Sequence, residues 1–345
     1  MVVERPVEIC WMNVIKAAPS DALWVITPFY NPVGYRRRFE NFKAFRRHLV
    51  APLLVVELAR EGRHCLADDD ADIVLRLTGE DRIWQKERLI NLGTAALPDH
   101  VRYVAWADCD LILSDPAWPA KVRAKLDANG GMTQLFNQAF HLPQEVDPQT
   151  ADLAVCANAK PILSALSIAH ALESGRFDKN EEDWRRKRKQ APGSAVFQDF
   201  YHCYGFAWAA KRETLARCGL YEGNAVGGGD ALKVFAALER IDEYWTTRNC
   251  GTDAHKAHFL LWAQKAREAG LFDAIGDIAQ NAYHLWHGAI ANRQYGARYD
   301  ILTRNDFDPA RDLSAEDAEV LRWTRPDSAL AREVGEFFVL RREDG

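Results

Sequence analysis

The sequence lacks paired cysteines, a long apolar run and an excess of positive charge, and each absence narrows what the protein can be. Its seven cysteines are scattered and form no CxxC pair, which predicts free thiols in a reducing cytoplasm rather than a disulfide framework. The N-terminus MVVERPVEICW carries acidic residues and no long apolar core, so it predicts no signal peptide. No apolar run is long enough to span a bilayer. We therefore expect a cytoplasmic protein without a membrane span.

Positive charge is not in excess overall, because 49 acidic residues outnumber 44 lysines and arginines. The net charge is −5 over 345 residues, which argues against a general nucleic-acid coat protein. Local basic segments are present at Arg36–Arg38, at Arg46 and Arg47, and at Arg185–Lys189 beside Trp184. Solvated surface charge is the simplest explanation for them, and phosphate binding is the alternative. Segment 178–194, which contains the last of these, predicts an exposed loop.

Apolar strands alternate with amphipathic helices in the first third of the chain. Segments 22–32, 52–59 and 102–113 are apolar and rich in β-formers, whereas 34–50 and 82–97 have helical periodicity. Strand, helix, strand, helix, strand is typical of a doubly wound α/β fold with a mostly parallel sheet. In such folds ligands bind at the carboxyl ends of the strands.

Two aspartates interrupt the third apolar segment, in the run VAWADCDLIL (104–113). Burying a carboxylate is costly unless a cation faces it, so Asp108 and Asp110 lie either at a surface turn or near a cation. Alternation along a strand directs both side chains to one side. Their oxygens are ligands that Mn²⁺ or Mg²⁺ prefers, and such an ion would in turn bind a diphosphate.

Two further patterns can carry chemistry. His284 and His287, in HLWH, share a face of a helix or turn, and with a carboxylate they would favour Mn²⁺ over Mg²⁺. Core histidines held by hydrogen bonds are the alternative. In VGGGD (226–230) the glycines allow a close backbone approach, and Asp230 begins a helix. That aspartate is either an ordinary N-cap or a carboxylate that takes a proton from an acceptor hydroxyl.

In their order and spacing these patterns resemble the GT-A glycosyltransferases, and within them the beta-1,4-galactosyltransferase family. That family has PFRNR after its first strand, FNRAKLLNVG on a helix, a DxD, a WGGEDDD run, and a metal-ligand histidine preceded three residues earlier by a second ligand. The corresponding segments here are PFYNP (28–32), WQKERLINLG (84–93), DCD (108–110), VGGGD (226–230) and HLWH (284–287). The resemblance runs from residue 22 to 302 and implies a GT-A, Rossmann-like fold that binds a nucleotide sugar.

The resemblance implies a role for each matched residue. Asp110, His284 and His287 would hold Mn²⁺ or Mg²⁺, and Asp230 would be the base that deprotonates the acceptor hydroxyl. A UDP-sugar donor would contact Pro28, Phe29, Tyr30, Asn31, Trp84, Lys86 and, near the ribose, Asp108. One base opposite the leaving UDP makes the transfer an in-line displacement that inverts the anomeric centre, with the ion offsetting the charge of the leaving group.

Several family positions differ in this chain. Two family arginines are replaced by Tyr30 and Pro32. The family's tryptophan, glutamate and second acid around the glycines are replaced by Val226, Gly229 and Ala231. In the family those last three side chains help to hold a sugar acceptor. Their loss implies an acceptor other than N-acetylglucosamine and leaves the donor sugar open.

The implied organisation is one transferase domain over 1–302 and a charged helical extension over 303–345 that packs on it or trails from it. A helix is expected at SAEDAEVLRW (314–323). The basic segments favour, as acceptor, a hydroxymethylated pyrimidine flipped out of DNA. A cytoplasmic glycan or lipid-linked saccharide is the alternative acceptor. The rival classes are a non-catalytic module that binds nucleotide sugars and a metal-dependent nuclease or phosphatase. The latter usually needs further carboxylates, and the run DDDAD (68–72), which we expect to be an exposed loop, is the one candidate.

Overall fold

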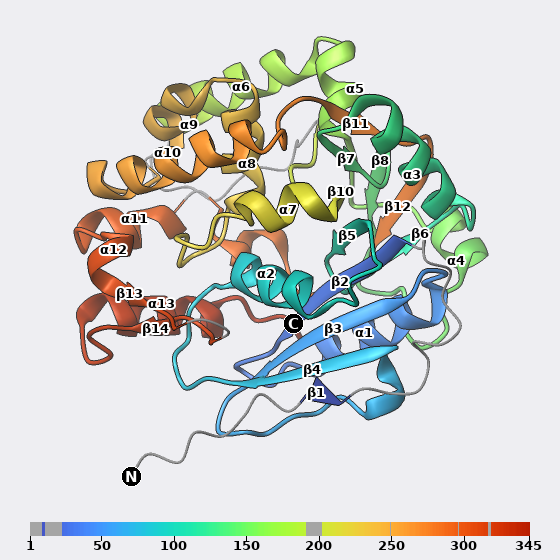
Figure 1. The fold of residues 1–345 in the computed structure, drawn as a ribbon, viewed down its shortest axis with the longest axis horizontal. Coiled ribbons are helices and arrows are strands. Elements are labelled where there is room, and N and C mark those ends of the chain that lie inside the picture. The colour runs from blue at the N-terminus through green and yellow to red at the C-terminus, as the bar shows by residue number, and fades with distance from the viewer. Residues whose placement is uncertain (1–8, 11–22, 191–201, 249, 296, 317–318) are drawn as a thin grey trace.

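The computed structural model describes residues 9–10, 23–190, 202–248, 250–295, 297–316 and 319–345 (Figure 1). Its strands are β1 (Ile9–Cys10), β2 (Leu23–Tyr30), β3 (Leu53–Ala59), β4 (Ile73–Thr78), β5 (Tyr103–Ala107), β6 (Leu111–Leu113), β7 (Met132–Gln134), β8 (Gln138–His141), β9 (Leu163–Leu166), β10 (Ala207–Lys211), β11 (Ile275–Asp277), β12 (Asn281–His284), β13 (Leu313–Ser314) and β14 (Arg322–Trp323). Its helices are α1 (Arg36–His48), α2 (Lys86–Ala96), α3 (Trp118–Asn129), α4 (Leu153–Asn158), α5 (Ile168–Glu173), α6 (Arg176–Gln190), α7 (Arg212–Cys218), α8 (Gly229–Ala237), α9 (Ile241–Arg248), α10 (Asp253–Glu268), α11 (Arg298–Arg304), α12 (Pro309–Asp312) and α13 (Ala329–Leu340), with the 3₁₀ turns η2 (Asp68–Asp70) and η3 (Ile290–Arg293).

The larger sheet has the strand order β1-β4-β3-β2-β5-β10-β7-β11. Strands β4, β3, β2 and β5 run parallel to one another, as do β7 and β11, whereas β10 is antiparallel to both of its neighbours. Helices lie on both sides of this sheet (Figure 1). The predicted α/β class, with a mixed and mostly parallel central sheet flanked by helices, is confirmed.

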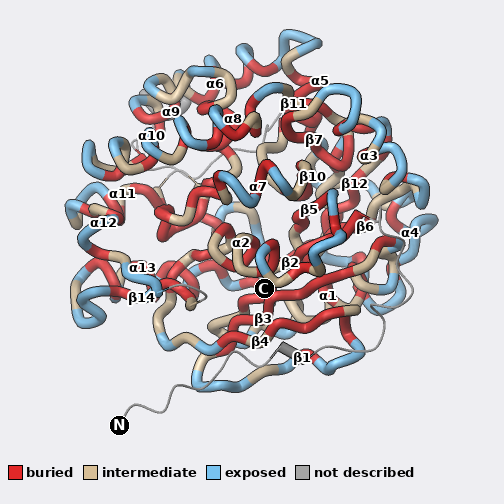
Figure 2. Tube along the Cα trace, in the orientation of Figure 1, coloured by how far each residue is buried: buried red, intermediate tan, exposed pale blue. Residues whose placement is uncertain are grey.

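Alternation along the central strands divides the core into two layers. On β2, Trp24 and Ile26 pack into one hydrophobic cluster, and Val25 and Phe29 pack into the other. Phe29 meets Phe42 of α1 edge to face, with ring centroids 5.3 Å apart. Figure 2 shows these strands as buried over almost their whole length. Because both faces are covered, the ends of the strands are where polar groups can reach a ligand.

Helix α2 packs very close to the sheet because of one glycine. A Cβ at Gly93 would lie 2.8 Å from Cγ2 of Ile26 and 2.9 Å from Cγ2 of Val56. The helix continues past Gly93 and ends at Ala96, shortly before Pro98. This close packing sets the position of Lys86, the first residue of the helix, relative to the ends of β2 and β5.

The third predicted strand is not continuous. Strand β5 ends at Ala107, and β6 begins at Leu111 in a second sheet with the order β6-β12-β8-β9. The three residues DCD form the corner between the two sheets. Backbone hydrogen bonds fix this corner, because the Asp108 N–H donates to Phe206 and the Asp110 carbonyl accepts from Leu285. A strand would have placed both aspartates on one side, whereas the corner lets them point to different partners.

Two segments that the sequence predicts as exposed loops contain helical structure and buried side chains instead. Within 178–194, residues up to Gln190 belong to helix α6, and Trp184 is buried under Arg248. Residues 191–194 and the side chains of 187–190 lie outside the described part of the chain. The acidic run 68–72 contains the turn η2, where Asp70 is buried and pairs with Lys43. Charge runs predict exposure poorly when each charge has a partner nearby.

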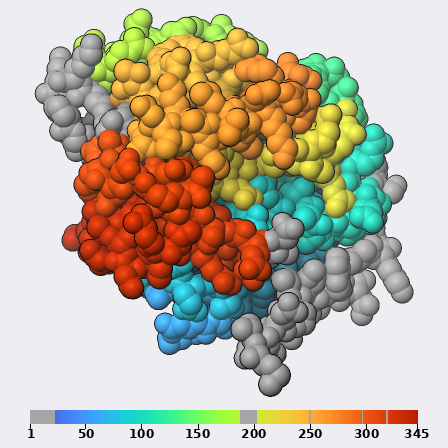
Figure 3. All heavy atoms as spheres, turned by 60° about the vertical axis from the view of Figure 1, so that its left-hand side comes forward, coloured from blue at the N-terminus to red at the C-terminus, as the bar shows by residue number. Residues whose placement is uncertain are grey.

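The C-terminal residues also depart from expectation. The predicted helix at 314–323 is wrong, because β13 and β14 form a two-stranded ladder there and Val320, Leu321 and Trp323 are buried in the main core. The long helix of this region is α13 instead. Figure 3 shows the C-terminal residues as a continuous red surface between the orange helices and the blue and cyan N-terminal residues. Within the described chain, no helix combines the length and apolar character needed to cross a bilayer.

Candidate active site

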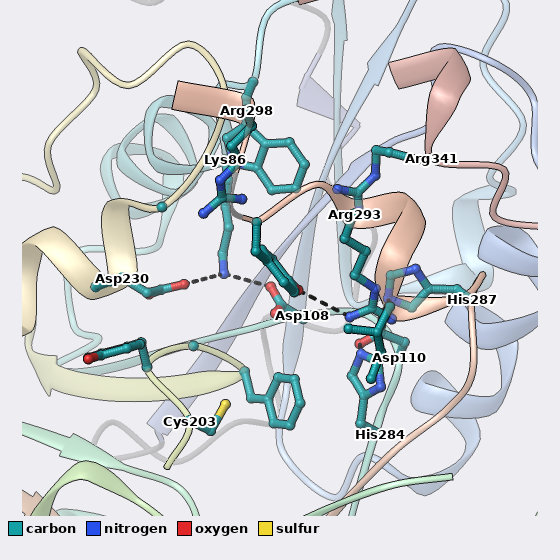
Figure 4. Close-up of a pocket in the computed structure, with 18 of the residues that line it drawn as sticks. Lys86, Asp108, Asp110, Cys203, Asp230, His284, His287, Arg293, Arg298 and Arg341 are labelled. Carbon is teal, nitrogen blue, oxygen red and sulfur yellow. Dashed lines mark hydrogen bonds and ion pairs between the residues drawn. The ribbon is translucent and has the colours of Figure 1, made fainter. Parts of the chain in front are cut away.

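A cavity of about 280 Å³ opens at the carboxyl ends of β2 and β5 (Figure 4). Its walls include nine of the residues singled out from the sequence, namely Pro28, Tyr30, Trp84, Lys86, Asp108, Asp110, Asp230, His284 and His287. Phe29 and Asn31 do not line it. Phe29 points into the core on the α1 side, and Asn31 forms two hydrogen bonds with the backbone of Tyr35. The segment PFYNP therefore contributes alternate residues to the cavity, as the pleat of β2 requires.

The triad of Asp110, His284 and His287 gathers potential metal ligands at one end of the cavity. Asp110 lies at the corner between the sheets, His284 ends β12, and His287 lies in the following loop rather than on a helix. One ligand atom from each lies within 4.8 Å of the others. His287 Nε2 is 3.1 Å from Asp110 Oδ2, and His284 Nε2 is 3.7 Å from Asp110 Oδ1.

The chemistry of the triad fits a divalent ion. Asp110 Oδ1 is buried and has no hydrogen-bond partner among the described residues. Burial opposes charge on Asp110, but the two histidines outweigh it and hold the pKa of this carboxyl below its ordinary value. Burial also holds the pKa of His284 well below its ordinary value, so the imidazole is neutral and its lone pair is available. Two imidazoles and a carboxylate are ligands suited to Mn²⁺.

Glu343, which the sequence gave no reason to select, supports this triad from the C-terminal segment. Its side chain is 2% exposed and lies 3.6 Å from Nδ1 of His287. Arg38 donates to both of its oxygens, at 2.8 and 3.0 Å, and Arg341 donates at 2.6 Å. Burial works against its charge, but these two arginines hold the pKa of Glu343 well below its ordinary value. Nδ1 of His287 has no hydrogen-bond partner among the described residues, so at 3.6 Å the Glu343 carboxylate attracts the imidazole without a direct hydrogen bond. A carboxylate in this position can orient a ligating imidazole.

Lys86 connects the two halves of the cavity. Its Nζ lies 2.6 Å from Asp108 Oδ1 and 3.0 Å from Asp230 Oδ2, as Figure 4 shows. Burial alone would lower the pKa of Lys86, but Asp108, Asp230 and Glu87 raise it well above its ordinary value. The cation that faces Asp108 is therefore this ammonium group, whereas the metal-ligand cluster contains Asp110 without Asp108.

Asp230 lies in the first turn of α8 and is not its N-cap, because Gly228 takes that position. Lys86 and Lys233 both hold its carboxylate, the latter at 3.2 Å. Burial would raise the pKa of Asp230, but the two lysines lower it, so the group is ionised at neutral pH. A Cβ at Gly205 would lie 3.0 Å from Asp230 Oδ2, so the absence of a side chain at Gly205 keeps space open at this carboxylate. An ionised carboxylate facing a cavity can accept a proton.

Glu87 is a second buried acid beside Asp230 that the sequence did not reveal. Its Oε1 would be 2.2 Å from a Cβ at Gly229, so this carboxyl group occupies the space that a side chain at 229 would need. Burial and the neighbouring Asp230 raise the pKa of Glu87 to about 7, against the opposing effect of Lys86 and Lys233. The glycine run before Asp230 is thus required partly by packing against other cavity residues.

Five arginines line the cavity: Arg38, Arg248, Arg293, Arg298 and Arg341. The sequence drew attention to Arg38 alone, as part of the basic segment Arg36–Arg38, and the other four were missed. They come from α1, α9, η3, α11 and the residue after α13, so no single local motif announces them. Arginines are common on any surface, and it is burial beside a cavity that distinguishes these five.

The basic residues of α1 are largely engaged by the fold. Arg37 donates to the carbonyls of Gln144, Val146 and Trp286, and Arg47 donates to the carbonyls of Pro148 and Gln149. Arg46 pairs with Asp72, and Arg36 pairs with Glu40. On the basic part of α6, Arg185 pairs with Glu243. These contacts leave little free positive charge for a nucleic-acid backbone on the described parts of these helices.

The comparisons with known proteins give no match by sequence and weak matches by structure. No family model matches the chain, and no curated protein matches its sequence. Among solved structures, TarS from S. aureus is similar over 79% of this chain and 38% of its own length, at 9% identity and a TM-score of 0.35. The catalytic domain of Drosophila beta1,4-galactosyltransferase 7, in complex with xylobiose, is similar over 74% and 64%, at 12% identity and a TM-score of 0.31.

A third solved structure is glucosyl-3-phosphoglycerate synthase from Mycobacterium tuberculosis, in complex with Mn²⁺, UDP and phosphoglyceric acid. It covers 76% of this chain and 70% of its own, at 13% identity and a TM-score of 0.31. The chain thus spans well under half the length of TarS and just under two thirds of the galactosyltransferase domain. Likenesses this weak assign no substrate or residue role to the chain.

Proposed function

We propose that the protein is an inverting, metal-dependent glycosyltransferase that moves a hexosyl group from a UDP-sugar to an acceptor hydroxyl. The observation that carries the proposal is one cavity with a metal-ligand triad at one end and an ionised carboxylate, Asp230, at the other. Lys86 lies between them and contacts both Asp108 and Asp230. The cavity lies at the carboxyl ends of parallel strands, where α/β proteins bind nucleotides.

The proposed reaction assigns a task to each end of the cavity. The acceptor oxygen bonds to the anomeric carbon of the donor, and the bond from that carbon to the phosphate oxygen breaks. The electron pair of the broken bond stays with UDP, and the hydroxyl proton passes to Asp230. Lys86 can donate a hydrogen bond to a phosphate oxygen. A divalent ion held by Asp110, His284 and His287 would act as a Lewis acid on the diphosphate.

A nuclease or phosphatase is the less favoured function. Two-metal sites need further carboxylates to bridge the second ion. Within the described ranges the one cluster with ligand geometry is the triad. The acidic run 68–72 lies outside the cavity, and its Asp68, Asp70 and Asp72 pair with Arg76, Lys43 and Arg46. A single ion beside a proton acceptor suits group transfer better.

The acceptor is the least constrained part of the proposal. Hydroxymethylated pyrimidines in DNA and a glycan or lipid-linked saccharide both offer a primary or secondary hydroxyl. The engaged arginines of α1 and α6 weaken the electrostatic argument for DNA, since phosphate binding needs free cationic side chains. Both acceptor classes are therefore arms of the experiment below.

The test is a UDP-release assay with a panel of UDP-sugars and Mn²⁺. It is run with DNA that contains hydroxymethylcytosine or hydroxymethyluracil, with saccharide acceptors, and without acceptor. Asp230→Asn should lower the rate of transfer by about 10²–10⁴-fold, because it removes the proton acceptor, while UDP still binds. Asp110→Ala should abolish the stimulation by Mn²⁺. Glu239→Gln is the matched control, because that side chain is 73% exposed.

Each outcome decides between classes. UDP release that needs Mn²⁺, Asp110 and Asp230 supports the transferase, and the acceptor that stimulates release identifies its class. UDP-sugar binding without any release in the wild type would indicate a binding module instead. Cleavage of DNA in Mn²⁺ without a sugar donor would indicate a nuclease. Failure to bind any UDP-sugar would refute the proposal.

A further inference from the structure

The five cavity arginines differ in whether a carboxylate faces them. Arg38 and Arg341 share Glu343, and Arg248 contacts Glu181 at 2.9 and 3.1 Å. Arg293 and Arg298 pair with no carboxylate among the described residues, and the Nε atom of each is buried without a hydrogen-bond partner. The carboxylates of Asp110 and Glu343 still favour the charge of Arg293, whereas the partners of Arg298 are Tyr295 and Tyr299. A buried guanidinium without a carboxylate partner, as at Arg298, is costly unless an anion fills the cavity.

The two arginines lie at different ends of the cavity (Figure 4). Arg293 lies beside the triad, and its Nη2 is 3.1 Å from His287 Nε2. The donor's diphosphate belongs at this end in the proposed function. Arg298 lies instead on the side of Lys86 and Asp230. A diphosphate held at the triad and Arg293 therefore leaves Arg298 without a partner.

The structure holds Arg298 firmly in place. Only 8% of the residue is exposed, and its guanidinium lies 5.1 Å from the ring centroid of Tyr295 and 5.0 Å from that of Tyr299. A Cβ at Gly227 would be 3.2 Å from Nη1, and a Cβ at Gly228 would be 2.9 Å from Nη2. The glycine turn before α8 thus closes around this side chain.

The start of α8 adds donors to the same place. Gly228 caps the helix in a left-handed conformation with φ of 99°, and no side chain caps its first turn. Gly228, Asp230 and Ala231 of this turn line the cavity with Arg298. The N–H of Ala231 already bonds to the Gly228 carbonyl, whereas the N–H groups of Gly229 and Asp230 have no partner among the described residues. Free N–H groups at a helix start and a guanidinium without a carboxylate partner are both donors that an anion can use.

We propose that Arg298, with the first turn of α8, binds one carboxylate or phosphate group of the substrates in addition to the donor's diphosphate. The proposal rests on the transferase function and deepens it, since it makes one substrate anionic near the reacting centre. The group belongs either to the acceptor or to the donor sugar, as in a uronic acid. Lys86 and Lys233 keep Asp230 from repelling it, because they already face that carboxylate.

The test is calorimetric titration of inorganic phosphate into the full chain saturated with UDP and Mg²⁺. The wild type should bind one phosphate. Arg298→Gln should weaken that binding by at least about tenfold while UDP affinity changes less than about twofold, the size expected when one charge-assisted contact is lost. Arg293→Gln should show the reverse, with weaker UDP binding and retained phosphate binding. Arg322→Gln, with a 60% exposed side chain, is the control.

Saturation with different donors identifies the source of the anion. If the acceptor carries it, phosphate binds alongside UDP-glucose and alongside UDP-glucuronate. If the donor sugar carries it, UDP-glucuronate excludes phosphate, and Arg298→Gln weakens UDP-glucuronate but not UDP-glucose. Either result supports the proposal.

The proposal is overturned if phosphate binds equally to the wild type and Arg298→Gln, or if no phosphate binds to the UDP-saturated wild type. It is also overturned if Arg298→Gln weakens UDP as strongly as Arg293→Gln does, because Arg298 then serves the diphosphate. Arg298→Lys keeps the charge and should retain part of the phosphate affinity, which separates a lost contact from a misfolded variant. If UDP itself does not bind, the transferase function fails, whereas phosphate titration of the UDP-free variants still tests Arg298.

Discussion

At the scale of one residue, Glu87 shows that the cavity wall disfavours a further negative charge beside Asp230. Its carboxyl group is buried under Gly229 and beside Asp230, and its pKa is raised to about 7. The folded chain therefore binds this proton more tightly than the unfolded chain does. The stability that this proton contributes is complete below the ordinary pKa of glutamate and is lost as the pH rises through the folded pKa.

Replacing Glu87 by Gln should remove this dependence on pH. The wild type should lose up to about 3 kcal/mol of unfolding free energy relative to Glu87→Gln between about pH 4.5 and 7. Urea denaturation at a series of pH values measures the difference. The exposed Glu239→Gln controls for the loss of one carboxylate from the chain. Parallel curves for the wild type and Glu87→Gln would contradict the prediction.

The residues that sequence reasoning selected are those with a local pattern. DCD and HLWH each place two candidate side chains within four positions, and VGGGD sets Asp230 behind three glycines. The order of these motifs resembles that of a known family, and this resemblance predicted that Asp110, Asp230 and the two histidines belong to one site. Arg293 and Arg298 have no functional pattern around them, and Glu343 lies in an ordinary charged run, RRED. Only folding brings the two arginines to the cavity and Glu343 to His287. No spacing rule distinguishes such residues from ordinary surface charges.

At the scale of elements, strands and helices with strong periodicity were predicted correctly, and charge runs were misleading. Helices α1 and α2 and strands β2 and β3 lie within the segments expected for them. The sequence of α6 predicts a loop because charged residues dominate it, and the buried position of Trp184 gives no clear apolar periodicity. The sequence does not reveal the break between β5 and β6, because apolar residues continue on both sides of DCD. Strand β5 pairs with β10, whereas β6 pairs with β12, and this choice of partner depends on tertiary contacts.

A paired glycine experiment tests the close packing of α2. Gly93→Ala should destabilise the fold by about 1 kcal/mol or more, because overpacking against Ile26 and Val56 outweighs the better helix propensity of alanine. Gly335→Ala in α13 is the matched control, since its nearest neighbour would be Arg82 Cδ at 3.8 Å. We expect it to stabilise the fold by about 0.5–1 kcal/mol. The melting temperatures of both variants, measured by thermal unfolding, test these two predictions. If Gly93→Ala raised the melting temperature, α2 would be able to move away from the sheet.

At the scale of the whole molecule, the cavity is built from both ends of the chain. Trp84 of the N-terminal half stacks on Phe338 of α13 at 6.1 Å and lies under Arg341 at 5.1 Å. Residues of the C-terminal segment are therefore part of the cavity wall. The sequence predicted a charged helical extension, packed on the domain or trailing from it, and gave no reason to expect that it lines the cavity.

Removing the carboxylate of Glu343 should weaken metal binding without removing a ligand. Glu343→Gln should lower the affinity for Mn²⁺ by about 10–100-fold, because the carboxylate no longer orients His287. The increase in melting temperature on adding Mn²⁺ measures this affinity, since an ion that binds only the folded state stabilises it. Glu336→Gln, an exposed acid on α13, is the control. Equal Mn²⁺ responses in both variants would show that Glu343 serves only to pair Arg38 and Arg341.

The corner at DCD has a mechanical consequence. Asp110 belongs to the link that leaves the large sheet, and His284 belongs to the last position of β12 in the small sheet. An ion bound by Asp110 and His284 would link the two sheets, whose strands form no hydrogen bonds to each other's ladder in the described chain. Binding of the ion would then make the corner at DCD more rigid. Amide hydrogen exchange at β6 and β12 should therefore slow when the ion is bound, although most residues of these strands lie outside the cavity.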